Sequence, residues 1–217
     1  MTKSSFTALS LLTVLAVLLT LTGALFSQFP LEIAFKPLAT VFILLIAVAN
    51  WRQWRDPYSF WIIVGLFFSL VGDVALLWPT HYFLPGLGAF LCTHVAYLFA
   101  FTRNVRFPAR PGVWLLYLAP VAALYAFLFP VLPAGLKLPV AFYSLFLASM
   151  AAQSMGCFLI LRTPAARLAA FGTLFFMISD SLLSLDRFRT PIPLAPLLVL
   201  FPYYVAQWLV ASSTNSS

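Results

Sequence analysis

Eight apolar runs determine how this chain can fold. A membrane-spanning helix needs about 20 mainly apolar residues. The runs cover residues 6–26, 35–50, 57–78, 82–103, 112–130, 138–161, 165–185 and 192–212. The second run is the shortest, and Pro37 would suit the first turn of its helix, where its missing N–H is not needed. We therefore expect an all-α integral membrane protein with eight transmembrane helices joined by short connections.

The composition excludes a water-soluble domain. Of 217 residues, 63% are hydrophobic and 8% are charged, whereas a soluble domain carries about 25% charged residues. No polar stretch is long enough to cover a core, so we expect residues 1–217 to form a single membrane domain. The formal charge of +7 does not indicate a nucleic-acid partner, because the basic residues cluster in short loops, where they orient helices.

The first apolar run follows Lys3 and resembles a secretory signal peptide. Its length of about 21 residues exceeds the usual apolar region of about 7–15 residues, and no clean A-x-A cleavage site follows it. We expect this segment to be retained as the first membrane helix.

The distribution of Lys and Arg predicts the orientation in the membrane. With a cytoplasmic N-terminus, the cytoplasmic side holds Lys3, Arg52, Arg55, Arg103, Arg106, Arg110, Arg162 and Arg167. The opposite side holds Lys36, Lys137, Arg187 and Arg189. Basic residues are enriched in cytoplasmic loops, so both termini are predicted to be cytoplasmic. We expect the chain in the inner (plasma) membrane of a bacterium.

Matched spacings indicate an internal duplication, with halves at residues 1–105 and 106–217. Asp73 maps to Asp180 at an offset of 107, and Lys36 maps to Lys137 at an offset of 101. The run His94-Val-Ala-Tyr97 maps to Tyr204-Val-Ala-Gln207 at an offset of 110. Four helices per half is an even number, so the two repeats would have parallel topology.

Asp73 and Asp180 lie inside apolar runs and are the first candidates for function. Each follows a glycine by eight residues, Gly65 and Gly172 respectively, so glycine and acid share a helical face. An ionised side chain inside hydrocarbon costs several kcal/mol, which makes an intramembrane Asp a functional-site candidate. The alternative is that each Asp is a polar clamp between helices.

If the two acids meet, they form an acid–base pair. Two nearby carboxylates cannot easily both ionise, so one holds a proton while its partner stays charged. The pair would then be a general acid beside a general base. A metal held by Asp73, His94 and Asp180 is a weaker alternative because no ligand-spacing motif is present, so we expect no metal and no cofactor.

Other polar residues in or near the apolar runs are predicted to contact a substrate. They are Lys36, His94, Tyr97, Tyr203, Tyr204 and Gln207. For Lys36 the alternative is snorkelling to the interface, and for His94 it is a hydrogen-bonded structural role. Glu32 and Asp186 are expected to lie outside the helices in solvent. Neither a glycine-rich phosphate loop nor a G-x-S-x-G elbow is present.

Several of these motifs, taken in order, resemble the YhhN-type lysoplasmalogenase family of eight-helix membrane proteins. The motifs are Lys36-Pro37, Gly72-Asp73, His94 with Tyr97, Ser179-Asp180 and Tyr203-Tyr204-x-x-Gln207, and the resemblance spans about residues 30–210. It implies hydrolysis of the vinyl ether bond of lysoplasmalogens, giving a fatty aldehyde and a glycerophospho-base. The motif acids would be Asp73 and Asp180, and the partner a lysophospholipid.

That reaction suits an Asp pair. Vinyl ether hydrolysis begins with protonation of an alkene carbon and continues with capture of an oxocarbenium ion by water, so it needs an acid and a nearby anion. Two other functions remain open. One is a proton-coupled carrier of a lipid or small amphiphile that uses the same Asp pair. The other is a membrane scaffold without catalysis. The sequence does not predict the oligomeric state.

Overall fold

The computed structural model describes residues 2–215 and contains, in that part of the chain, eight long helices and no strand. The helices are α1 (Lys3–Leu25), α2 (Phe29–Trp54), α3 (Pro57–Ala75), α4 (Pro79–Thr102), α5 (Pro111–Leu128), α6 (Ala134–Leu161), α7 (Pro164–Phe188) and α8 (Ala195–Ser212), followed by a short 3-10 turn, Ser213–Asn215. All eight are long and apolar enough to cross a membrane. This confirms the predicted fold class.

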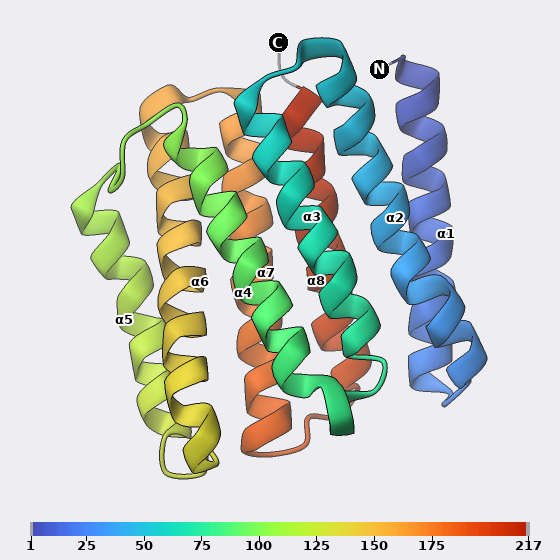
Figure 1. Ribbon diagram of the computed structural model, residues 1–217, viewed down its shortest axis with the longest axis vertical. Helices are drawn as coiled ribbons and strands as arrows, with labels where there is room; N and C mark the ends of the chain where they lie inside the picture. The colour runs from blue at the N-terminus through green and yellow to red at the C-terminus, as the bar shows by residue number, and fades with distance from the viewer. Residues whose placement is uncertain (1, 216–217) are drawn as a thin grey trace.

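The helices form one bundle, with α1 at one edge and α5 at the other (Figure 1). Both chain termini lie at the same end of the bundle, as an even number of spans requires (Figure 1). Large apolar side chains are exposed on the outside of the bundle, for example Leu11, Leu116 and Leu138, each about two-thirds exposed. Such exposure suits a lipid environment and not water. Which end faces the cytoplasm stays a prediction.

The start of α2 differs from the prediction. The helix begins at Phe29, six residues before the predicted start at residue 35, so Pro37 lies inside the helix and not in its first turn. Pro30 takes the first-turn position instead. The start of α2 was predicted too late because the charged residues Glu32 and Lys36 interrupt the apolar pattern there. As a result Lys36 lies two turns inside α2 and is buried.

Other helix ends also differ from the predicted runs by three or four residues, and three of them are extensions into polar or Pro-containing sequence. α4 begins at Pro79, with a kink at Tyr82 (φ −116°, ψ 19°), and α6 begins at Ala134. α7 continues to Phe188, so Asp186 is helical and does not lie in a loop as predicted. Polar and Pro residues near these ends mark boundaries in the sequence pattern, although the backbone remains helical through them.

The connections before α3 and α7 share one geometry. Arg55 and Arg162 both adopt a left-handed conformation (φ 53° and 55°) and end the preceding helix. Asp56 and Thr163 follow them as N-caps, each with Pro next in the chain. Both pairs are offset by 107 residues, the offset between Asp73 and Asp180.

Helix packing has the same order in both halves. Consecutive helices pack from α1 to α4 and again from α5 to α8. Two of the contacts that join the halves, α2 against α8 and α4 against α6, are equivalent if α1–α4 correspond to α5–α8, whereas α8 also contacts α1 and α3. These features support the predicted duplication, which stays a prediction.

Candidate active site

A cavity of about 340 Å³ lies toward the end of the bundle opposite the termini, between α2, α3, α4, α7 and α8. Asp73 from α3 and Asp180 from α7 both line it. The other charged or hydroxyl side chains in its wall are Glu32, Lys36, Ser179, Asp186, Arg187 and Tyr203. Two acids that are 107 residues apart in the sequence therefore face one space.

Asp73 is buried and held by two hydroxyl groups. Thr40 Oγ1 on α2 and Tyr203 OH on α8 both donate to Asp73 Oδ2, at 2.5 Å and 2.7 Å. Lys36 lines the same cavity and places a positive charge near this carboxylate. Charge-assisted hydrogen bonds of this kind are about twice as strong as neutral ones, so they fix the position of the carboxylate.

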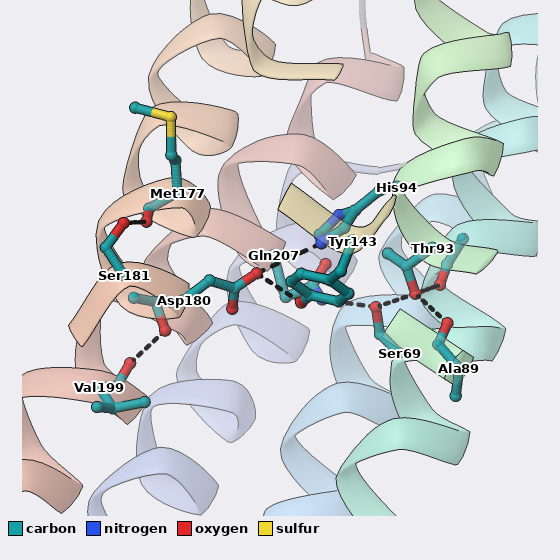
Figure 2. A network of polar contacts seen from close by, with 12 residues as sticks. Ser69, Ala89, Thr93, His94, Tyr143, Met177, Asp180, Ser181, Val199 and Gln207 are labelled. Carbon is teal, nitrogen blue, oxygen red and sulfur yellow. Dashed lines mark hydrogen bonds and ion pairs between the residues drawn. The ribbon is translucent and has the colours of Figure 1, made fainter. Parts of the chain in front are cut away.

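Asp180 accepts a hydrogen bond from a side chain of α6 and lies close to a side chain of α4. Tyr143 OH donates to Asp180 Oδ2 at 2.6 Å, and His94 Nε2 lies 3.3 Å from the same oxygen (Figure 2). The His94 contact has ion-pair distance without hydrogen-bond geometry, and neither ring nitrogen has a hydrogen-bond partner within residues 2–215. The ring is fully buried and packs edge-on against Tyr143 and Phe176, both at 4.9 Å between centroids.

Tyr97 and Gln207 belong to a separate buried network. Tyr97 OH donates to Gln207 Oε1 at 2.6 Å, and Gln207 Nε2 donates to Ser69 Oγ at 2.7 Å. Ser69 and Thr93 hydroxyls are 3.1 Å apart (Figure 2). Neither Tyr97 nor Gln207 is among the residues that line the cavity. Their bonds join α3, α4 and α8, so we expect them to act through helix packing.

The two adjacent tyrosines of α8 have different positions. Tyr203 lines the cavity and binds Asp73, as described above. Tyr204 instead donates to the backbone carbonyl of Lys36 at 3.1 Å, and lines an apolar groove between α1 and α8. Tyr204 therefore supports the helix turn that carries Lys36, although it does not face the acids.

The two glycines in the matched frames serve helix packing. A Cβ on Gly65 would lie 2.3 Å from Cε1 of Tyr97, and a Cβ on Gly172 would lie 2.9 Å from the Ala206 carbonyl oxygen. Each glycine therefore allows a neighbouring helix to pack closely and does not leave space for a ligand. The shared spacing of glycine and acid reflects how α3 packs on α4 and α7 on α8.

Glu32 and Asp186 were predicted to lie in solvent outside the helices, and this was wrong. Both are helical, half-buried and part of the cavity wall. Asp186 Oδ1 accepts a hydrogen bond from the Ile192 N–H at 2.8 Å, which ties the end of α7 to the segment before α8. The cavity mouth is therefore more acidic than the sequence suggested.

Tyr143 and Thr40 are the two site residues that the sequence did not single out. Each comes from the second helix of its half and donates to the Asp on the third. Hydroxyl residues are common in apolar helices and carry no spacing signal, so only the duplication could have pointed to them. Within residues 2–215 no group of three or more His, Cys, Asp or Glu side chains is arranged as a metal site.

A larger cavity of about 1010 Å³ opens at the other end of the bundle, between the ends of α4 and α6 and the starts of α3 and α7. Its carboxylate is Asp56, whose Oδ1 already accepts the Ser59 N–H as the N-cap of α3. Neither Asp73 nor Asp180 reaches it. The smaller cavity is therefore the candidate active site.

Residues 31–214 match the model of the YhhN family. The chain belongs to the YhhN family. This confirms the resemblance seen in the sequence motifs.

The chain is 35% identical to human lysoplasmalogenase TMEM86A over 188 residues, which are 83% of this chain and 76% of the relative. It is 35% identical to pig (Sus scrofa) lysoplasmalogenase TMEM86B over 160 residues, 74% of this chain. It is 32% identical to a lysoplasmalogenase of Mycobacterium bovis over 186 residues, 82% of this chain and 67% of the relative. The chain spans 66% of the length of the pig relative and 61% of human TMEM86B. No solved structure matches the chain.

Proposed function

We propose that this YhhN family member is a membrane-embedded hydrolase that cleaves the vinyl ether bond of a lysophospholipid, with Asp73 and Asp180 as its acid–base pair. The observation that carries the proposal is that both acids line one cavity inside a lipid-facing bundle. Relatives at 32–35% identity bear the name lysoplasmalogenase, which supports the same reaction class.

The reaction needs a proton donor and an anion on either side of one bond. A protonated carboxyl transfers its proton to the alkene carbon that is not bonded to oxygen, and the electrons of the double bond form the new C–H bond. The resulting oxocarbenium ion is stabilised by the second, ionised carboxylate. Water then adds to the carbon next to oxygen and gives its proton to that carboxylate.

The hemiacetal formed in this way breaks to a fatty aldehyde and the free hydroxyl of a glycerophospho-base. The donor carboxyl has lost one proton and the other carboxylate has gained one, so the pair returns to its starting charge after proton exchange. No redox partner is required. Thr40, Tyr203 and Tyr143 hold the two carboxylates in place during the reaction, and preorganised groups of this kind lower the barrier without rearranging.

The charged wall of the cavity suits a zwitterionic head group. Lys36 and Arg187 supply positive charge for a phosphate, while Glu32 and Asp186 supply negative charge for an amine. These four residues come from the first two turns of α2 and the last turn of α7. A glycerophospho-ethanolamine or -choline head group carries both of these charges.

The test is aldehyde release from a lysoplasmalogen by the purified full chain in detergent. We expect wild-type protein to release aldehyde, and D73N and D180N to lose at least about 10²-fold in kcat/KM, the range for general acid–base residues. D56N is the matched control, because it makes the same chemical change at an N-cap outside the cavity and Asn also caps helices. Thermal unfolding of each variant shows whether it is folded.

Full activity in a folded D73N or D180N variant would refute the Asp-pair mechanism. Proton-driven uptake of the lipid into proteoliposomes with no aldehyde formed would instead identify a carrier.

A further inference from the structure

A second, mainly apolar cavity meets the candidate active site at Asp180. It lies between α4, α5, α6 and α7, and we name it the α4–α7 cavity. Its wall includes Phe90, Leu124, Val140, Leu147, Asp180 and Arg187. Asp180, Arg187 and Phe90 also line the active-site cavity, whereas Asp73 and Lys36 do not reach the α4–α7 cavity. Asp180 therefore lies at the boundary between a polar space and an apolar one.

The same boundary exists within the proposed substrate. In a vinyl ether lysophospholipid, the reactive double bond joins the polar glycerol head to the hydrocarbon chain. If the head occupies the active-site cavity and the chain leaves through the α4–α7 cavity, the double bond lies at the wall that the two cavities share, where Asp180 is the one carboxylate lining both. Burial of apolar carbon contributes about 0.8 kcal/mol per methylene, which favours this orientation over the reverse.

We infer that the α4–α7 cavity binds the first carbons of the alkenyl chain and places the double bond beside Asp180. The inference rests on the proposed function for the identity of the substrate, while the cavity itself is a site for a single hydrocarbon chain.

The size of the cavity limits what it holds. Its volume is about 60 Å³, room for about four groups of the size of water or methylene at about 15 Å³ each. This space accommodates the first few carbons of one hydrocarbon chain. The remainder of the chain extends beyond the cavity into the surrounding lipid.

A rival apolar space exists on the other side of the bundle. The groove between α1 and α8 is lined by Val14, Leu18, Phe201 and Trp208 among others, and neither Asp73 nor Asp180 lines it. A chain bound there would hold its double bond away from both carboxylates. The two spaces are lined by different helices, so labelling experiments can distinguish which one holds the chain.

The experiment uses an alkyl lysophosphoethanolamine that lacks the double bond, so that it cannot be hydrolysed, with a diazirine a few carbons along its chain. After illumination of the full-length protein in detergent micelles, labelled residues are mapped by mass spectrometry. We expect labels on α5 and α6 around Leu124, Val140 and Leu147. Labels confined to α1 and α8, or spread over the outer surface as from detergent-like contact, would overturn the inference.

Blocking variants give a second measurement. S144F on α6 fills the α4–α7 cavity and should lower labelling there, and should lower kcat/KM for long-chain substrate by about tenfold or more, as expected for a mis-sized hydrophobic pocket. L124W on α5 is a second blocking variant in case S144F fails to fold. A123F is the matched control, because Ala123 is exposed on α5 next to Leu124 and does not line the cavity. Equal effects of A123F and a folded blocking variant would contradict the inference.

The outcomes separate the two proposals. Labelling of the α4–α7 cavity without aldehyde release from the vinyl ether substrate refutes the proposed function and leaves the chain site standing. Aldehyde release with labelling elsewhere refutes the chain site and leaves the hydrolase standing.

Discussion

Substituting Gly65 with Ala tests how tightly α3 and α4 pack beside the candidate active site. The new Cβ would lie 2.3 Å from Cε1 and 2.5 Å from Cδ1 of Tyr97. The tyrosine ring has no room to move, because it is fully buried and its hydroxyl is bonded to Gln207. The ring must shift and break that bond, or the helices α3 and α4 must separate.

The expected magnitude follows from three contributions. Overpacking costs about 1–3 kcal/mol. Leaving the buried Gln207 Oε1 without its hydrogen-bond donor costs about 1–3 kcal/mol more. Ala in place of Gly inside a helix offsets about 1 kcal/mol. The net loss in unfolding free energy is therefore about 1–5 kcal/mol, which lowers Tm by at least about 2 °C for a chain of this size.

Gly88 on α4 is the matched control. It is exposed, and a Cβ there would meet no atom within 4 Å. Thermal unfolding in detergent should show G65A with a lower Tm than wild type and G88A with an equal or higher one. Equal Tm changes in the two variants would refute the packing argument for Gly65.

Three further variants test the site. Y143F removes the hydroxyl that donates to Asp180 and should lower kcat/KM about 10- to 150-fold, the value of a hydrogen bond to a charged group; unchanged kinetics would contradict this. K36M removes the positive charge beside Asp73 and should lower kcat/KM about tenfold, about 1.4 kcal/mol, while K36R keeps more activity; equal kinetics of K36M and K36R would show that the charge is not used. Y97F leaves Gln207 Oε1 unpaired and should lower the unfolding free energy by about 1–3 kcal/mol with kcat/KM of the folded protein unchanged; a kinetic loss with normal stability would instead indicate contact with substrate.

The eight helices could be predicted because each is a long apolar run, a signal that does not depend on tertiary contacts. Asp73 and Asp180 could be predicted as candidates because a carboxylate inside hydrocarbon is rare. The structure places both in the wall of one cavity, as the matched frames indicated. The start of α2 was predicted too late, because Glu32 and Lys36 interrupt the apolar pattern in a part of the helix that faces a cavity and not lipid.

The hydrogen-bond donors to Asp73 and Asp180 could not be predicted from the sequence. Which hydroxyl reaches which carboxylate depends on helix rotation, and that is set by packing such as Tyr97 against Gly65. For the same reason Tyr203 faces Asp73 while its neighbour Tyr204 binds the backbone of Lys36. For Tyr143 the sequence offered only the possible duplication, because Tyr143 on α6 and Thr40 on α2 each donate to the Asp of the following helix.

The most direct test of the paired acids is the kcat/KM of D73N, D180N and the D73N/D180N double variant on a lysoplasmalogen, with all three shown to be folded. Groups that act as one unit are strongly non-additive, since losing either one already disables the pair. We expect the kcat/KM of the double variant to lie within about tenfold of the kcat/KM of the less active single variant. Losses that multiply in the double variant, or a single variant with wild-type activity, would show that the two carboxylates do not work together.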